Sequence, residues 1–144
     1  MLNVHRIITR TAVEGPGQRF AIWLQGCNRH CEGCFVPQTW SKEPNLLYTQ
    51  EQIINMINAE KDIEGITILG GEPFEQAEEL CSLLMHLDKK LSVIIFTGYT
   101  LNKKKKKNDI YVNSIINMVD VLVDGEFIIS QMDISDILEN PCVR

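Results

Sequence analysis

The sequence lacks the features that direct a chain to a membrane, to export or to nucleic acid. No apolar run in its 144 residues approaches the ~18–20 residues that a membrane-spanning helix needs. Residues 1–6 lack the basic and then apolar composition of a signal peptide. A formal net charge of -5 does not favour a nucleic-acid partner. We therefore expect a cytoplasmic protein that binds neither membrane nor nucleic acid.

No internal repeat divides the chain, and its composition is ordinary for a globular protein, with 44% hydrophobic and 23% charged residues. A chain of 144 residues is long enough to bury one hydrophobic core. We predict that residues 1–144 form a single domain.

Cysteines are few and unevenly placed, which argues against a disulfide framework. Cys27, Cys31 and Cys34 have the spacing C-x3-C-x2-C, whereas Cys81 and Cys142 lie far along the chain. An odd number of cysteines, three of them crowded together, is typical of metal or cluster ligation in a reducing compartment. Three such thiolates can hold three corners of a 4Fe-4S cluster. A ferredoxin supplies a fourth cysteine to close this shell, and here none is near, so we expect one iron to be left open to bind a substrate.

A zinc site is the alternative for this loop, with His30 as a fourth ligand. Zinc sites usually take paired ligands from two chain segments, and here there is one group of cysteines without a second pair. His30 also directly precedes Cys31, and two adjacent side chains seldom reach one ion. The residues favour a cluster over zinc.

The remaining sequence predicts an α/β fold with a mostly parallel sheet. Apolar runs predict strands at residues 3–9, 19–25, 65–69, 92–97 and 119–123. Helices are expected at residues 74–90 and 109–117, and also after Thr49, which begins a capping box with Gln52. From residue 49 onward strands and helices alternate, which indicates βα units and parallel strands.

Several candidate binding residues directly follow predicted strands. They are the cysteine loop, Gly70 with Gly71, Thr97 with Gly98, and Asp124 with Gly125. Ligands of parallel α/β folds bind at the carboxyl ends of the strands. We therefore expect all four segments to lie at one edge of the sheet.

The segment Gly70-Gly71-Glu72-Pro73 has two interpretations. It can be a helix start, with Glu72 near the positive end of the helix dipole and Pro73 in the first turn. It can also be a binding segment, because two glycines at a strand end let the backbone approach a ligand, and Glu72 can accept hydrogen bonds from a cationic amino group. The cysteine loop in the same chain favours the second interpretation.

These motifs resemble those of radical S-adenosylmethionine (SAM) enzymes, and among them the activating proteins of anaerobic ribonucleoside-triphosphate reductase. The resemblance is carried, in order, by residues 14–19, 26–34, 39–40, 70–73, 97–99 and 121–125. It implies a small incomplete (βα) barrel of the radical SAM type. Members of that family continue beyond the point that corresponds to residue 144, so we expect the last strand of the barrel to be missing.

The resemblance also implies a role for each site residue. Cys27, Cys31 and Cys34 would be the catalytic metal ligands, holding three irons of a 4Fe-4S cluster whose fourth iron binds SAM. The cofactor-binding residues that it implies are Gly33, Phe35, Gly70, Gly71, Glu72, Thr97 and Gly98. Of these, Gly71 and Glu72 would meet the amino group of SAM, and the residues flanking Cys34 would contact its nucleoside.

The implied reaction is reductive cleavage of SAM to methionine and a 5′-deoxyadenosyl radical. That radical would take a hydrogen atom from a glycine of a large partner subunit, the anaerobic ribonucleotide reductase, with an electron donor such as flavodoxin or ferredoxin. Another radical SAM activity, on a peptide or small molecule, is one alternative. A non-catalytic module that binds a cluster or zinc is the other.

Cys81 carries a different expectation. It lies beside Leu80 and Leu84 on a predicted helix, which indicates a small buried side chain in the core and not a ligand.

Overall fold

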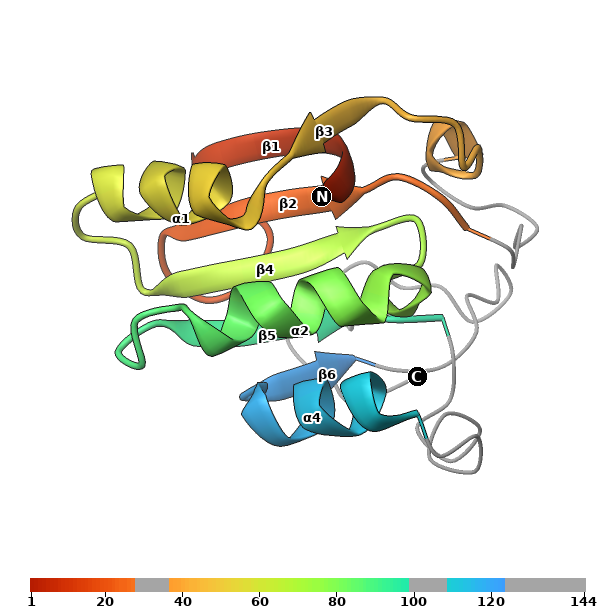
Figure 1. Ribbon diagram of the computed structural model, residues 1–144. Helices are drawn as coiled ribbons and strands as arrows, with labels where there is room; N and C mark the ends of the chain where they lie inside the picture. Colours follow the sequence, from red (N-terminus) through yellow and green to blue (C-terminus); the bar gives the residue numbers. More distant parts are fainter. Residues whose placement is uncertain (28–36, 99–108, 124–144) are drawn as a thin grey trace, which may run out of the picture.

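Six strands form one mixed sheet in the computed structural model, which describes residues 1–27, 37–98 and 109–123 (Figure 1). The strands are β1 (Leu2–Thr11), β2 (Arg19–Leu24), β3 (Leu46–Tyr48), β4 (Gly65–Gly70), β5 (Ser92–Phe96) and β6 (Val121–Val123). Their order in the sheet is β3-β1-β2-β4-β5-β6. Strands β2, β4, β5 and β6 run parallel, whereas β1 is antiparallel to both of its neighbours.

The helices follow strands in the alternating order that the sequence predicts from residue 49 onward. They are α1 (Gln50–Ala59), α2 (Ala77–Met85) and α4 (Ile110–Met118), with short 3-10 turns η1 (Pro37–Thr39) and η2 (Pro73–Gln76). Figure 1 shows α1, α2 and α4 on the same face of the sheet. The α/β class with a mostly parallel sheet is confirmed. Closure into an incomplete barrel stays a prediction, and the missing last strand concerns residues outside the described ones.

The main core lies between the sheet and these helices. In β2, Phe20, Ile22 and Leu24 belong to this core, whereas Ala21 and Trp23 belong to a second cluster on the opposite face. All six residues of β2 are buried, as expected for a parallel strand that is covered on both faces. The strand that leads into the cysteine loop is therefore fixed on both sides.

Two local predictions have different outcomes. The capping box of α1 is confirmed, since Thr49 Oγ1 accepts the Gln52 amide (3.1 Å) and Gln52 Oε1 accepts the Thr49 amide (2.8 Å). The helix predicted at 74–90 is wrong at both ends, because η2 precedes α2 and the helix stops at Met85. After Met85, the amides of His86 and Leu87 donate to the carbonyl oxygens three residues earlier, which is the pattern of a 3-10 turn. The Asp88 side chain then accepts the Lys90 amide, which starts a turn.

The edge strand β3 was not predicted. It has three residues and pairs antiparallel with the start of β1, with Leu47 opposite Asn3. Three residues are too few for an alternating pattern to be recognised. Among the helices of the described residues, none has both the length and the apolar character needed to cross a membrane.

Candidate functional site

Three of the segments predicted to share one edge of the sheet follow adjacent parallel strands. Cys27 follows β2, Gly71 and Glu72 follow β4, and Thr97 follows β5. The register places Leu24 beside Gly70, so the strands end at the same level. The predicted edge is confirmed for these segments. Asp124 and Gly125, the fourth segment, lie outside the described residues.

The two ends of the cysteine loop are tied together by backbone hydrogen bonds. Gly26 donates its amide to the Thr39 carbonyl (2.6 Å), and Cys27 donates to the Trp40 carbonyl (3.2 Å). The chain that enters the loop is therefore paired with the chain that leaves it. The described ends of the loop, Gly26 with Cys27 and Thr39 with Trp40, are thereby held next to each other and form its base.

Gln25 secures the same base through its side chain. Its amide nitrogen donates to the carbonyl oxygens of Gln38 (3.2 Å) and Ser41 (2.7 Å), and Gln76 Nε2 donates to its carbonyl (3.1 Å). Gln25 was predicted only as the last residue of a strand. The sequence does contain a sign of its further role, because Gln25 is a polar residue at the end of an apolar run. A buried side-chain amide needs hydrogen-bond partners.

Both glycines at the end of β4 are required by contact with the strand that leads to the cysteines. Gly70 has a φ of 103°, and a Cβ there would lie 2.5 Å from the Leu24 nitrogen. A Cβ on Gly71 would lie 2.3 Å from the Gly26 carbonyl oxygen. The Gly71 amide donates to the Leu24 carbonyl (2.9 Å). The sequence predicts that a ligand approaches the backbone at these two glycines. The structure shows that the backbone of Leu24 and Gly26 approaches them.

Gly71→Ala is expected to displace the end of β4 from the base of the cysteine loop. Because the new methyl group meets a backbone oxygen and not a flexible side chain, the strand itself must shift, at a cost of roughly 1–3 kcal/mol. The variant should melt at a lower temperature and retain less iron per chain after anaerobic reconstitution. Wild-type iron content together with a wild-type melting temperature would contradict this account of Gly71.

Glu72 is 1% exposed and caps η2. Its Oε1 accepts the Phe74 amide (3.1 Å), and Pro73 follows at the first position of the turn. The segment therefore begins a helical turn, as one interpretation predicts, but this turn is a 3-10 turn that precedes α2. The same carboxylate also reaches the next strand, where Thr97 Oγ1 (2.5 Å) and the Gly98 amide (2.8 Å) donate to it. Glu72 therefore links the ends of β4 and β5.

Cys27 is the one predicted cluster ligand that the described residues contain. Its side chain is 8% exposed, at the strand-end edge and beside the base of the loop. A thiolate at this place is the type of soft ligand that iron–sulfur clusters take. Cys31, Gly33, Cys34 and Phe35 lie outside the described residues, so their roles stay predictions. Within the described ranges no group of three or more His, Cys, Asp or Glu side chains could hold a metal ion.

The sheet face away from the helices carries charged groups near its apolar cluster. The Arg6 guanidinium lies 5.2 Å from the centre of the Trp23 ring, within the range of a cation–π interaction. Partial burial raises the pKa of Glu14 above its ordinary value, and the positive charge of Arg6 opposes that rise. These residues precede or lie on the strand that leads to Cys27, but none was predicted as a site residue.

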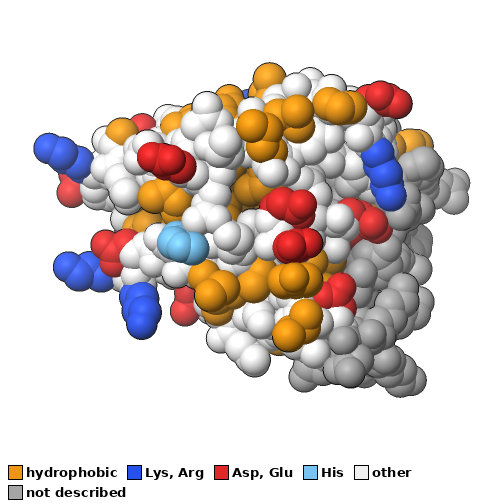
Figure 2. Space-filling model, viewed as in Figure 1, with side chains coloured by type: hydrophobic (Ala, Val, Ile, Leu, Met, Phe, Trp, Pro, Cys, Tyr) orange, Lys and Arg blue, Asp and Glu red, His pale blue; other side chains and the backbone are white. Residues whose placement is uncertain are grey.

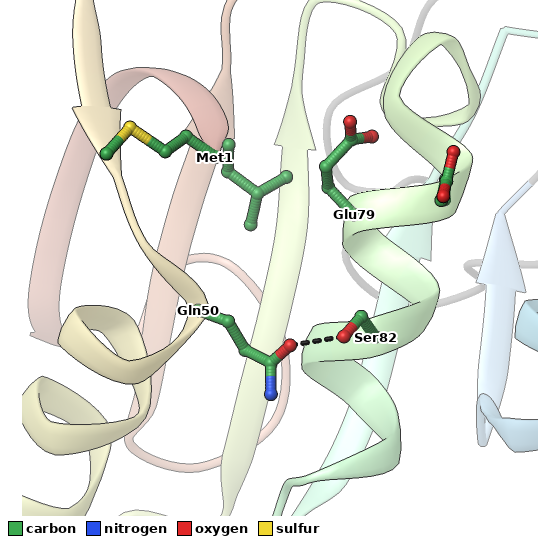
Figure 3. A pocket seen from close by; sticks show the side chains of 6 residues that line it. Met1, Gln50, Glu79 and Ser82 are labelled. Atoms are coloured by element: carbon green, nitrogen blue, oxygen red, sulfur yellow. Dashed lines mark hydrogen bonds between the residues drawn. The ribbon is translucent and has the colours of Figure 1, made fainter.

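A pocket of about 300 Å³ lies on the helical face, between α1 and α2 (Figure 3). It is lined by Met1, Leu2, Gln50, Glu78, Glu79 and Ser82. Its acidic residues lie in the first turn of α2, where the helix dipole stabilises negative charge, and Figure 2 shows acidic side chains gathered over this part of the molecule. The Ser82 hydroxyl donates to Gln50 Oε1, as drawn in Figure 3. No predicted site residue lines this pocket.

Comparison with known proteins gives consistent matches over most of the chain. The profile of the 4Fe-4S single cluster domain family matches residues 13–140. The anaerobic ribonucleoside-triphosphate reductase-activating protein of Vibrio cholerae is 32% identical over 92% of this chain and 88% of its own length. The proteins of the same name from Enterobacteria phage T4 and Escherichia coli K12 are 29% and 27% identical, each over 88% of this chain and over 81% and 86% of their own lengths.

Proposed function

We propose a radical-generating function for this chain, which belongs to the family of anaerobic ribonucleoside-triphosphate reductase-activating proteins. The proposed reaction is the reductive cleavage of SAM to methionine and a 5′-deoxyadenosyl radical, for which a bound 4Fe-4S cluster supplies the electron. The radical then generates a glycyl radical on a partner enzyme, the anaerobic ribonucleotide reductase. A flavodoxin or ferredoxin is the proposed electron donor.

The observation that carries this proposal is the joining of three strand ends at one edge. The Glu72 amide donates to the Gly26 carbonyl (2.9 Å), and the Glu72 side chain accepts from Thr97 (2.5 Å). One residue thus connects the start of the cysteine loop with the end of β5. A cluster held by the loop and a ligand held at β4 and β5 would lie side by side, as the reaction needs.

The residues that the sequence predicts for the site have separate parts in this proposal. Cys27 would hold one iron, with Cys31 and Cys34 as the other two thiolate ligands. Gly71 and Glu72 would meet the SAM amino group, and Thr97 and Gly98 would line the same cavity. Gly33 and Phe35 would contact the nucleoside. The protein's contribution is to orient the two groups and to keep water away from a reactive carbon radical.

The position of the site supports a macromolecular partner. Cys27, Glu72 and Thr97 lie at the ends of adjacent strands, on one edge of the sheet. A site on the edge of a sheet can be closed by a partner that docks over it. A glycine-bearing loop of the partner would then reach the radical without exposing it to solvent.

The test is electron paramagnetic resonance of anaerobically reconstituted, dithionite-reduced protein, recorded with and without SAM. We expect the signal of a reduced 4Fe-4S cluster, and we expect SAM to change its shape because SAM binds the iron that lacks a cysteine ligand. A colourless protein that holds zinc, or a cluster that is indifferent to SAM, would instead support the non-catalytic module. A glycyl radical on an added reductase separates the activating function from another radical SAM activity.

A further inference from the structure

The Glu72 carboxylate is held from three directions inside the protein. It is 1% exposed, and its two oxygens accept hydrogen bonds from Phe74, Thr97 and Gly98. The first donor lies on the same chain segment, and the other two lie at the end of the neighbouring strand β5. The carboxylate is therefore turned toward β5 and is engaged by the protein itself.

The Thr97 hydroxyl makes the shortest of these contacts. Its Oγ1 donates to Glu72 Oε1 across 2.5 Å, a short distance for a hydrogen bond between two oxygens. A hydroxyl has one proton, so the Thr97 proton is directed to Glu72 in this pair. Thr97 is 2% exposed, and its amide donates to the Val123 carbonyl (2.9 Å), which fixes the backbone that carries the hydroxyl.

The backbone of residues 71–72 is fixed on its other side by β2. The Gly71 amide donates to the Leu24 carbonyl and the Glu72 amide to the Gly26 carbonyl, both at 2.9 Å. Residue 72 is consequently held by its amide toward the cysteine loop and by its side chain toward Thr97. Loss of the Thr97 hydroxyl would remove the shortest of the three hydrogen bonds that hold the side chain, and would leave the amide anchor in place.

We infer that Thr97 is a positioning residue for SAM, which acts through Glu72. Its hydroxyl holds the Glu72 carboxylate, and thereby the backbone of residues 71–72, in the orientation that meets the SAM amino group. This inference rests on the proposed function. It differs from the expectation drawn from the sequence, in which the Glu72 side chain is itself available to the amino group.

The matched variants are Thr97→Val, which keeps the shape and removes the hydroxyl, and Thr97→Ser, which keeps the hydroxyl and removes a methyl group. The readout is the Kd of SAM, from titration of the cluster signal in electron paramagnetic resonance, with iron content as the control. Thr97→Val should bind SAM about tenfold more weakly, which corresponds to about 1.4 kcal/mol, at unchanged iron content. Thr97→Ser should bind it like the wild type. Should Thr97→Val fail to fold, Thr97→Ala removes the same hydroxyl.

A double-mutant cycle with Glu72→Gln tests whether Thr97 acts through Glu72. The effects of two substitutions that disrupt the same contact do not add. The double variant should therefore bind SAM as weakly as the single variant with the larger loss of affinity, and no more weakly. Additive losses, or a Thr97→Val protein that binds SAM like the wild type, would overturn the inference alone. A wild-type protein that holds its cluster but does not bind SAM would overturn the proposed function, and the inference with it.

Discussion

Cys27→Ala is expected to abolish SAM cleavage. The proposed cluster has only three cysteine ligands, so the loss of one leaves two, and no other cysteine of the described residues lies beside the loop. Cys27 lies at the base of the loop, where its amide is already bonded to Trp40, so its position does not depend on the metal. The variant should fold but retain little iron, and anaerobic assays should detect no 5′-deoxyadenosine.

Cys81→Ala is the matched control. Cys81 is 5% exposed and lies in the main core beside Leu80 and Leu84, as the sequence predicts for a small buried side chain. Removing its sulfur should lower the free energy of unfolding by roughly 1 kcal/mol and leave iron content and cleavage unchanged. Loss of cleavage in folded Cys81→Ala protein would show that the ligand assignment is wrong. Retained cleavage in all three variants Cys27→Ala, Cys31→Ala and Cys34→Ala would rule out the cluster assignment.

Arg19→Met is expected to be the most destabilising substitution away from the cysteines. The Arg19 side chain is 1% exposed, although arginine is almost never fully buried unless it is paired. Its Nε donates to Thr67 Oγ1 (2.9 Å), its Nη1 donates to Ser92 Oγ (2.8 Å) and Pro16 O (3.4 Å), and its Nη2 donates to Ile66 O and Ser92 O (both 2.8 Å). All five donors of the guanidinium are thus in use.

These bonds tie together the starts of three neighbouring strands. Arg19 begins β2, Ile66 and Thr67 lie near the start of β4, and Ser92 begins β5. Burial lowers the pKa of Arg19, and the nearby carboxylates of Glu64 and Asp120 oppose that effect. The charge is retained in the folded protein, because arginine is not deprotonated in proteins. Methionine has a similar length but no donor, so it would leave several buried oxygens without a partner.

We expect Arg19→Met to lower the free energy of unfolding by roughly 3–5 kcal/mol, since it breaks a buried hydrogen-bond network. The melting temperature should fall by on the order of 10 °C for a domain of this size. Arg19→Lys should be intermediate, because an ammonium group cannot reproduce the planar fork of donors. Denaturant unfolding measures the free energy of unfolding of each variant, and thermal melts measure its melting temperature.

Arg10→Met serves as the control for the loss of a charged side chain. Arg10 is exposed on β1 and makes one hydrogen bond, from Nη1 to the Lys61 carbonyl (2.6 Å), among the bonds of the described residues. A surface substitution of this kind should change stability by about 0.5 kcal/mol or less. Equal destabilisation by the Arg10 and Arg19 substitutions would mean that net charge, and not the buried network, is responsible.

The sequence by itself determined what depends on local pattern. Each of these patterns lies within about ten residues of chain: the cysteine spacing, the capping box at Thr49, and the apolar runs of β2, β4 and β5. Alternation of strands with helices then implied parallel strands, and parallel strands implied a common edge for Cys27, Gly71 and Thr97. Those inferences needed no knowledge of contacts between distant segments, and the described structure bears them out.

Only the tertiary structure decided which side chains tie the strands together at their two ends. Arg19 bonds to Ser92 and Gln76 bonds to Asn3, each across 73 positions of sequence, and Glu72 bonds to Thr97 across 25. A polar residue in the sequence does not reveal a partner so far away. Likewise, the sequence predicts that a ligand approaches the backbone at Gly71, and only the packed structure reveals the Gly26 backbone against it. Long-range hydrogen bonds and backbone contacts arise when the sheet assembles, so no local pattern encodes them.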